Sequence, residues 1–217
     1  MIGEHIENRA IYLMQRLRPF LAEGPLTMFY IAGGALVGQP NDVDIFPCPY
    51  SAAPVFLAPV VSKTKNAITY DTEPWPVQVC SYTADTTREL VESFDYTHIQ
   101  VGAKIRATSK VCSVLDVAYT PGFILAAVSG QTKFTGSEFP LSSLLRAGKY
   151  YKRELMTSRQ YTANILTAVT AVIKRGFANW EDFKNQIDAI DLGLVADDLE
   201  GTQQELHELY YALHREE

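Results

Sequence analysis

The sequence predicts a mixed α/β fold in two parts, and three observations support that prediction. Short apolar, β-prone runs recur up to about residue 135. From Leu141 onward, apolar residues recur instead at three- and four-residue steps, which is typical of amphipathic helices. The chain has 217 residues with 47% hydrophobic and 20% charged side chains, so it can bury a core. We therefore expect a sheet-containing domain over residues 1–135 and a helical subdomain over residues 136–217.

Local patterns predict the elements of each part. In the first part, apolar spacing predicts helices at residues 6–22, 86–93 and 121–129, the last with proline in its first turn. Runs of β-prone residues predict strands at 28–32, 43–46, 66–70, 77–82 and 94–101. In the second part, we expect helices at 141–156, 159–175, 180–190 and 202–214.

Composition excludes several classes of protein. No apolar run reaches the roughly 18 residues that a membrane span needs, so no membrane partner is expected. The N-terminal segment MIGEHIENRA has acidic residues where a signal peptide would carry basic ones. Three widely spaced cysteines fit reduced thiols and no disulfide framework. These features predict a cytoplasmic protein.

The net charge of −6 is distributed unevenly along the chain. Residues 1–103 carry −5, residues 104–175 carry +8, and residues 176–217 carry −9. The basic middle third is compatible with nucleic-acid binding, although the whole chain is acidic. The alternative is that this basic third pairs with the acidic C-terminal segment within the fold.

The most informative segment is YIAGGALVGQPNDVDIF at residues 30–46. Its first strand ends in Gly33 and Gly34, whose missing side chains allow backbone N–H groups to approach a phosphate. Asp42 and Asp44 alternate along the next strand, so both side chains point to one face. Two close carboxylates repel unless a cation lies between them, and Mg²⁺ commonly binds carboxylates together with substrate phosphates. The alternative is a surface strand with two solvated aspartates.

A third carboxylate, Asp95, lies in the β-prone run at residues 94–98. Aspartate is disfavoured in strands, and one between two aromatic residues is expected to be partnered or functional. Together with Asp42 and Asp44, it indicates a two-metal site for phosphoryl transfer. The alternative is a hydrogen-bonded aspartate at a sheet edge.

These motifs resemble the nucleotidyltransferase superfamily of polymerase beta, poly(A) polymerases and CCA-adding enzymes. A closer resemblance is to nucleotidyltransferase-like proteins of tailed bacteriophages. The matching segments run in order over residues 30–153 and read GGALVGQPNDVDIF, KNAITY, VQV, FDYTH and KFTGSEFPLSSLLRAGKYYKR. The resemblance implies a nucleotidyltransferase-type mixed sheet flanked by helices, followed by a C-terminal helical subdomain. It also implies a viral protein that acts in the cytoplasm of a bacterial host.

The resemblance implies a role for each matched residue. Gly33 and Gly34 match the glycines that hold the triphosphate. Asp42 and Asp44 match the pair that ligates two Mg²⁺ ions. Asp95 matches the carboxylate that ligates the metal activating the attacking hydroxyl. CCA-adding enzymes carry an Arg-Asp pair soon after the glycines, whereas this chain reads ALVG there, which argues against CCA addition in particular.

Basic residues near the start of the helical part are further candidates for binding nucleotide. Three of them recur at three- and four-residue steps on one expected helix and share a face. Such a group could hold a triphosphate or a nucleic-acid backbone, and the alternative is an ordinary solvated helix face. The candidates are Lys133, Arg146, Lys149 and Arg153.

The sequence thus predicts an enzyme that transfers a nucleotide from an NTP to an acceptor hydroxyl, with two Mg²⁺ ions and release of pyrophosphate. The expected acceptor is an RNA or tRNA end, a protein side chain or a small molecule. One alternative is a catalytically silent phage protein that uses the same fold to bind a host protein or a virion component. Another is a nucleic-acid-binding protein without turnover.

Overall fold

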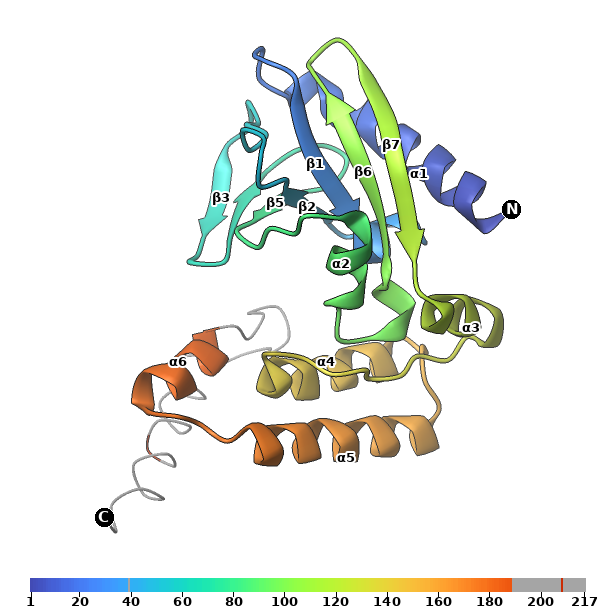
Figure 1. Ribbon diagram of the computed structural model, residues 1–217, viewed down its shortest axis with the longest axis vertical. Coiled ribbons are helices and arrows are strands. Elements are labelled where there is room, and N and C mark those ends of the chain that lie inside the picture. The colour runs from blue at the N-terminus through green and yellow to red at the C-terminus, as the bar shows by residue number, and fades with distance from the viewer. Residues whose placement is uncertain (39, 189–207, 209–217) are drawn as a thin grey trace. The chain divides into compact units, whose positions relative to one another are not determined.

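The computed structural model describes residues 1–38, 40–188 and 208. The chain divides into two compact units, Met1–Thr135 and Gly136–Glu217 (Figure 1). The helix expected at residues 202–214 lies outside the described residues, apart from residue 208. Across the described ranges, no helix combines the length and the apolar character that crossing a membrane requires.

The N-terminal unit is a seven-stranded mixed sheet with helices on its faces. Its strands are β1 (Thr27–Ala32), β2 (Val43–Pro47), β3 (Val60–Lys63), β4 (Ala67–Tyr70), β5 (Val77–Cys80), β6 (Val101–Ala107) and β7 (Cys112–Tyr119). Its helices are α1 (Ile2–Leu17), α2 (Thr87–Glu92) and α3 (Pro121–Ser129), with short 3-10 helices η1 (Arg18–Phe20), η2 (Gly33–Leu36) and η3 (Thr97–Ile99). This mixed α/β architecture confirms the fold class that the sequence predicts.

The strands lie in the order β3-β4-β5-β2-β1-β6-β7 (Figure 1). All neighbouring pairs are antiparallel except β2 and β5, which run parallel. A parallel pair requires a crossover connection, and the β3–β4 hairpin forms part of that crossover here. The two central strands β1 and β2 come from the glycine and aspartate motif, so this motif lies in the middle of the sheet.

Helices α1 and α2 cover opposite faces of the sheet (Figure 1). Ile31 of β1 packs in the larger cluster, together with Leu13 and other apolar residues of α1. Its neighbour Tyr30 points the other way and packs with Leu90 of α2. Alternation along β1 therefore builds two cores, one on each side of the sheet.

The first helix differs from its expected range at both ends. It begins at residue 2 and ends at Leu17, instead of spanning residues 6–22. The chain continues as the 3-10 helix η1, which contains Pro19. Because proline has no N–H and its ring clashes with the preceding turn, the α-helix stops before it.

The local pattern also fails to predict three strands, β3, β6 and β7. All four residues of β3 are exposed, so this strand has no apolar face that alternation could reveal. Strand β6 contains Gly102, which has weak intrinsic preference for a strand. A Cβ at Gly102 would lie 2.9 Å from Val91 Cγ1, so the glycine is required by the close approach of α2. Tertiary packing thus outweighs propensity here.

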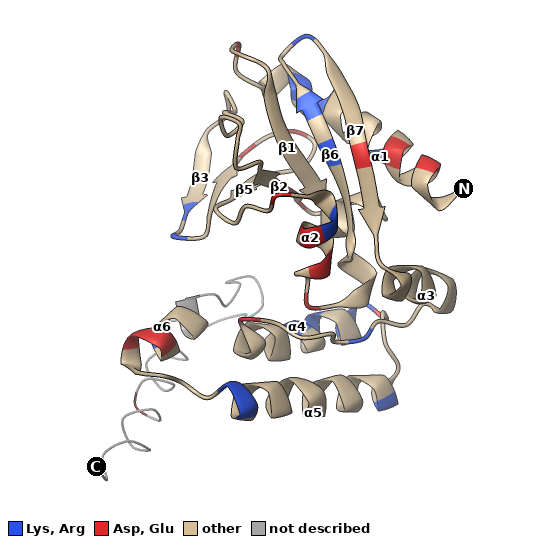
Figure 2. Ribbon diagram, viewed as in Figure 1, with Lys and Arg blue, Asp and Glu red and all other residues tan. Residues whose placement is uncertain are grey.

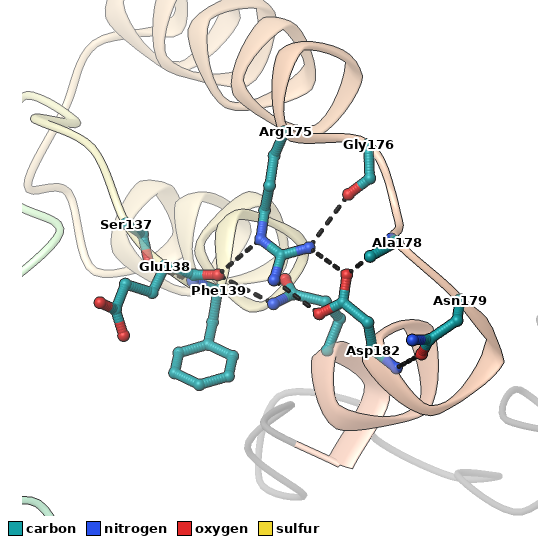
Figure 3. A network of polar contacts seen from close by, with 9 residues as sticks. Ser137, Glu138, Phe139, Arg175, Gly176, Ala178, Asn179 and Asp182 are labelled. Atoms are coloured by element: carbon teal, nitrogen blue, oxygen red, sulfur yellow. Dashed lines mark hydrogen bonds and ion pairs between the residues drawn. The ribbon is translucent and has the colours of Figure 1, made fainter.

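The C-terminal unit contains α4 (Pro140–Lys152), α5 (Ser158–Arg175) and α6 (Trp180–Asp188). Arg175, at the end of α5, connects these elements (Figure 3). Its Nη1 and Nη2 donate to the two carboxylate oxygens of Asp182 in α6, at 2.8 and 2.7 Å. Its Nε donates to the carbonyl of Glu138 just before α4, at 3.1 Å. One guanidinium therefore joins α5 to α6 and to the segment that precedes α4.

The Arg175–Asp182 pair should make the stability of this unit depend on pH. The Arg175 hydrogen bonds, together with the Ala178 N–H, lower the pKa of Asp182 from 3.8 to about 2. Because the folded-state pKa lies below the ordinary value, the stabilisation is complete above about pH 4 and is lost as the pH falls through about 2. Melting curves from about pH 5 to about pH 2 should show a smaller drop for Asp182→Asn than for the wild type.

The neighbouring Glu181, also in the first turn of α6, provides the control. Glu181→Gln removes a similar charge but leaves the Arg175 pair in place. It should keep the wild-type pH dependence. If Asp182→Asn also follows the wild-type profile, the pair does not contribute to the acid lability of the unit.

Candidate active site

The glycine turn follows β1 directly and is positioned by the core. Gly33 has φ of 80°, in the left-handed region where other residues are strained by about 1–2 kcal/mol. Ala35 and Leu36 are buried and fix the far end of η2 in the larger core. A Cβ on Gly33 would lie 4.0 Å from Asp44 Oδ2, so the turn passes close to this carboxylate. The structure therefore brings the glycine and aspartate motifs together.

Asp44 lies in β2, in the centre of the sheet. It pairs with Ala32 of β1 on one side and with Gln78 of β5 on the other. Its neighbours Val43 and Ile45 are buried in the core beneath α1, so the Asp44 side chain points to the opposite face. Asp42 immediately precedes β2 and is exposed. Asp44 thus lies within β2, and Asp42 lies immediately before the first residue of that strand.

Cys80, which the sequence pattern did not single out, lies in β5 two residues beyond Gln78, the strand partner of Asp44. Burial raises the pKa of the Cys80 thiol, and the negative charges of Asp44 and Asp42 raise it further. Both carboxylates therefore contribute negative charge at the same thiol. Alternation along β5 puts Gln78 on the same face as Cys80. The parallel pairing of β2 with β5, which creates this neighbourhood, is not visible in the local sequence.

Asp95 does not lie in a strand, and the strand predicted at residues 94–101 is wrong. Asp95 lies in a bend after α2, and it is followed by a single bridge between Tyr96 and Phe134 and by η3. Side-chain donors bond the backbone carbonyls that would otherwise pair with a neighbouring strand. Polar side chains commonly compete with regular secondary structure in this way. Thr135 Oγ1 donates to the carbonyls of residues 94 and 95, each at 3.1 Å, and Gln100 Nε2 donates to the first of them at 2.8 Å.

The bend nevertheless packs against the face that carries Asp44. The ring of Phe94 lies 5.7 Å from that of Phe46, which is two residues beyond Asp44 in β2. Asp95 itself is only 3% exposed. The third carboxylate of the predicted site is thus a buried residue of this unit, although its local structure differs from the expected one.

The predicted basic residues belong to both units. Lys133 lies in the N-terminal unit, where its backbone N–H donates to Thr97 Oγ1 at 3.0 Å. Arg146 and Lys149 lie on α4, and Arg153 caps that helix. Basic residues lie along α4 and at both ends of α5 (Figure 2). Nucleotide binding by these four residues stays a prediction.

Asp42, Asp44 and Asp95 are the side chains predicted to bind a divalent cation. Among residues 1–38, 40–188 and 208, no group of three or more His, Cys, Asp and Glu side chains is arranged to hold a metal ion. Ligation by all three aspartates therefore stays a prediction. Asp42 and Asp44 nevertheless concentrate negative charge on one face. Mg²⁺ is commonly held by one or two carboxylates with substrate phosphates, so the chemistry of this pair fits it.

Comparison with solved structures finds similarity to CCA-adding enzymes, which belong to the nucleotidyltransferase superfamily. The chain is similar to the Thermotoga maritima CCA-adding enzyme complexed with tRNA-CCA, with a TM-score of 0.46 over 86% of this chain and 49% of that one. It is also similar to a CCA-adding enzyme in complex with CTP, with a TM-score of 0.48 over 86% and 48%. A tRNA-processing enzyme in its apo form I gives 0.41 over 86% and 50%. Identity is 14% in each case.

The chain spans about half the length of these structures. At this identity the likeness concerns the fold alone. No family model and no curated protein matches the chain. The resemblance to phage proteins stays a prediction.

Proposed function

We propose that the N-terminal unit transfers a nucleotide from an NTP to an acceptor hydroxyl. The observation that supports this most directly is the position of the left-handed glycine turn beside the Asp44 carboxylate. A Cβ added to Gly33 would lie 4.0 Å from Asp44 Oδ2. A close-approach backbone turn beside a pair of carboxylates suits a triphosphate that is held together with a divalent cation. The residues from which the sequence predicts this chemistry thus come from adjacent ends of β1 and β2.

In the proposed reaction, the acceptor hydroxyl gives up its proton to water, and its oxygen forms a bond to the α-phosphorus. The bond from that phosphorus to the α–β bridging oxygen breaks, and pyrophosphate leaves with the electron pair. When bound, the Mg²⁺ ions would neutralise triphosphate charge and favour ionisation of the attacking hydroxyl. Asp42 and Asp44 would hold them, with Asp95 as the predicted third ligand. The Gly33–Gly34 turn would orient the triphosphate through its backbone.

For the acceptor, we propose an RNA end that is bound through its phosphates. Residues 104–175 contain 11 Lys and Arg against 3 Asp and Glu, although the chain as a whole is acidic. The face of α4 with Arg146 and Lys149, together with Arg153 at its end, offers cations at the spacing of one helix face. Such residues bind nucleic-acid backbone without reading its sequence.

The test of the proposed function is ligand-induced stabilisation followed by turnover. The full chain is melted with Mg²⁺ and each of the four NTPs, with Mg²⁺ alone and each NTP alone as controls. A ligand that binds only the folded state at about 100 times its Kd stabilises it by about 2.7 kcal/mol. For a protein of this size, that raises Tm by roughly 5–10 °C.

Pyrophosphate release with short RNA acceptors then tests transfer itself. The proposed function expects at least one NTP to raise Tm in the presence of Mg²⁺ and to be consumed with an acceptor. A Tm that no NTP moves would contradict it. The chain would then be better described as a binding protein that uses this fold without turnover.

A further inference from the structure

Arg9, on α1, connects the N-terminal helix with the glycine turn. Its Nε donates to the carbonyl of Ala35 at 3.0 Å, and its Nη2 donates to the carbonyl of Gly38. The guanidinium also packs over the ring of Tyr12, at 5.2 Å from the ring centre. One turn further along α1, Leu13 is anchored in the main core. Arg9 therefore extends from a rigid element to two points of the turn.

These two hydrogen bonds add to backbone bonds that the turn makes within itself. The backbone N–H groups of Val37 and Gly38 both donate to the carbonyl of Gly34, at 3.1 and 3.2 Å. Carbonyls at the end of a short helix lack partners within it, and a cation is favoured there. Arg9 supplies a planar, charged fork that donates to one such carbonyl, that of Ala35, and to the carbonyl of Gly38 just beyond the helix.

The segment that Arg9 holds lies between the two halves of the candidate site. It begins at Gly33, beside Asp44, and ends a few residues before Asp42. A shift of this segment would change the path of the backbone that is proposed to orient the triphosphate. Since Arg9 donates to the carbonyls of residues 35 and 38, it acts on the turn from the side of α1 and need not contact a substrate.

We propose that Arg9 is a positioning residue that fixes the turn at residues 33–38 and thereby sets the affinity of the site for the NTP triphosphate. The second half of this statement rests on the proposed function. A residue with this role differs from one that only stabilises the fold. Its removal weakens NTP binding and loosens residues 33–38 more than a neighbouring substitution with the same effect on Tm.

Arg16 provides the matched control. It lies on the same helix, and its guanidinium packs over the same Tyr12 ring, at 5.5 Å from the centre. Within the part of the chain that the structure describes, no hydrogen bond joins Arg16 to the turn. Arg16→Ala therefore removes the same charge and the same kind of ring contact without touching the turn.

The experiment compares the wild type with Arg9→Ala, Arg9→Lys and Arg16→Ala. Amide hydrogen exchange of residues 33–38 should accelerate about tenfold or more in Arg9→Ala, as expected for the loss of charge-assisted hydrogen bonds. The Kd for Mg²⁺–NTP should rise by a similar factor. Arg9→Lys should also lose most of the effect of Arg9, because one ammonium cannot donate to both carbonyls in the same geometry. Arg16→Ala should leave both quantities at the wild-type values.

The two proposals fail in different ways. If no NTP binds the wild type, the proposed function fails, while hydrogen exchange still decides whether Arg9 fixes the turn. If the wild type binds NTP and the Kd is unchanged in both Arg9 variants, the inference about Arg9 is overturned while the proposed function stands. Unchanged exchange at residues 33–38 would overturn it as well. Should Arg9→Ala fail to fold, Arg9→Lys, which retains the charge and the aliphatic stem, provides the same comparison.

Discussion

Replacing Asp44 by asparagine is expected to reduce nucleotide transfer by about 10²–10³-fold or more, which is the usual effect of losing one charge-stabilising group at a reaction centre. Asparagine retains the size and much of the hydrogen-bonding shape of aspartate but not its charge. The variant should still fold, because Asp44 points away from the core that contains Ile45. The initial rate of pyrophosphate release and the Mg²⁺-dependent shift in Tm measure the effect.

The stability of this variant should be unchanged or slightly higher. Asp42 and Asp44 lie two residues apart at the start of β2 with side chains on one face, so their like charges repel each other when no cation is bound. Neutralising one member of a functional pair commonly stabilises a protein. The double variant Asp42→Asn and Asp44→Asn should therefore melt at the wild-type temperature or above it, without response to Mg²⁺.

Glu23→Gln is the control for net charge. Glu23 is an exposed residue after η1 and lies outside the candidate site. This variant should release pyrophosphate at the wild-type rate. Full activity in Asp44→Asn would remove Asp44 from the proposed mechanism, whereas equal losses in Asp44→Asn and Glu23→Gln would point to a general effect of charge.

Replacing the next residue, Ile45, by alanine should destabilise the fold, whereas Asp44→Asn should not. We expect a loss of about 2–5 kcal/mol in the free energy of unfolding. Ile45 is fully buried, pairs with Ile31 and Val79 in the centre of the sheet, and packs in the core beneath α1. Truncation removes apolar contacts and leaves a cavity that a rigid sheet cannot easily close. For a protein of this size, Tm should fall by roughly 10 °C.

Urea denaturation followed by circular dichroism measures this loss. Ile45→Val removes a single methylene and should cost about 0.5–1.5 kcal/mol, so the two variants form a graded series. Below its lower Tm, the Ile45→Ala protein should still bind Mg²⁺–NTP, because Asp44 lies on the other face. A loss of stability in Asp44→Asn as large as that in Ile45→Ala would contradict the assignment of the two faces.

The sequence by itself determined the parts of this protein in which local pattern and tertiary packing agree. The alternation of residues 42–46 predicts both the strand β2 and the outward direction of Asp44, because the period of two is a property of extended backbone. The amphipathic spacing around Leu13 predicts α1, and Pro121 predicts the start of α3. The helices of the second part are also visible in the sequence, because their apolar residues recur at three- and four-residue steps.

Only the tertiary structure decided which segments meet. The parallel pairing of β2 with β5 brings Gln78 beside Asp44, and no local signal encodes that pairing. The bend at Asp95 forms because Thr135, forty residues along the chain, bonds its carbonyl, which overrides the β-prone sequence around it. Arg9 meets the glycine turn across 26 residues of sequence. Long-range hydrogen bonds and strand order arise from the packing of the whole unit. Local patterns indicate only which residues of a segment face the core and which face solvent.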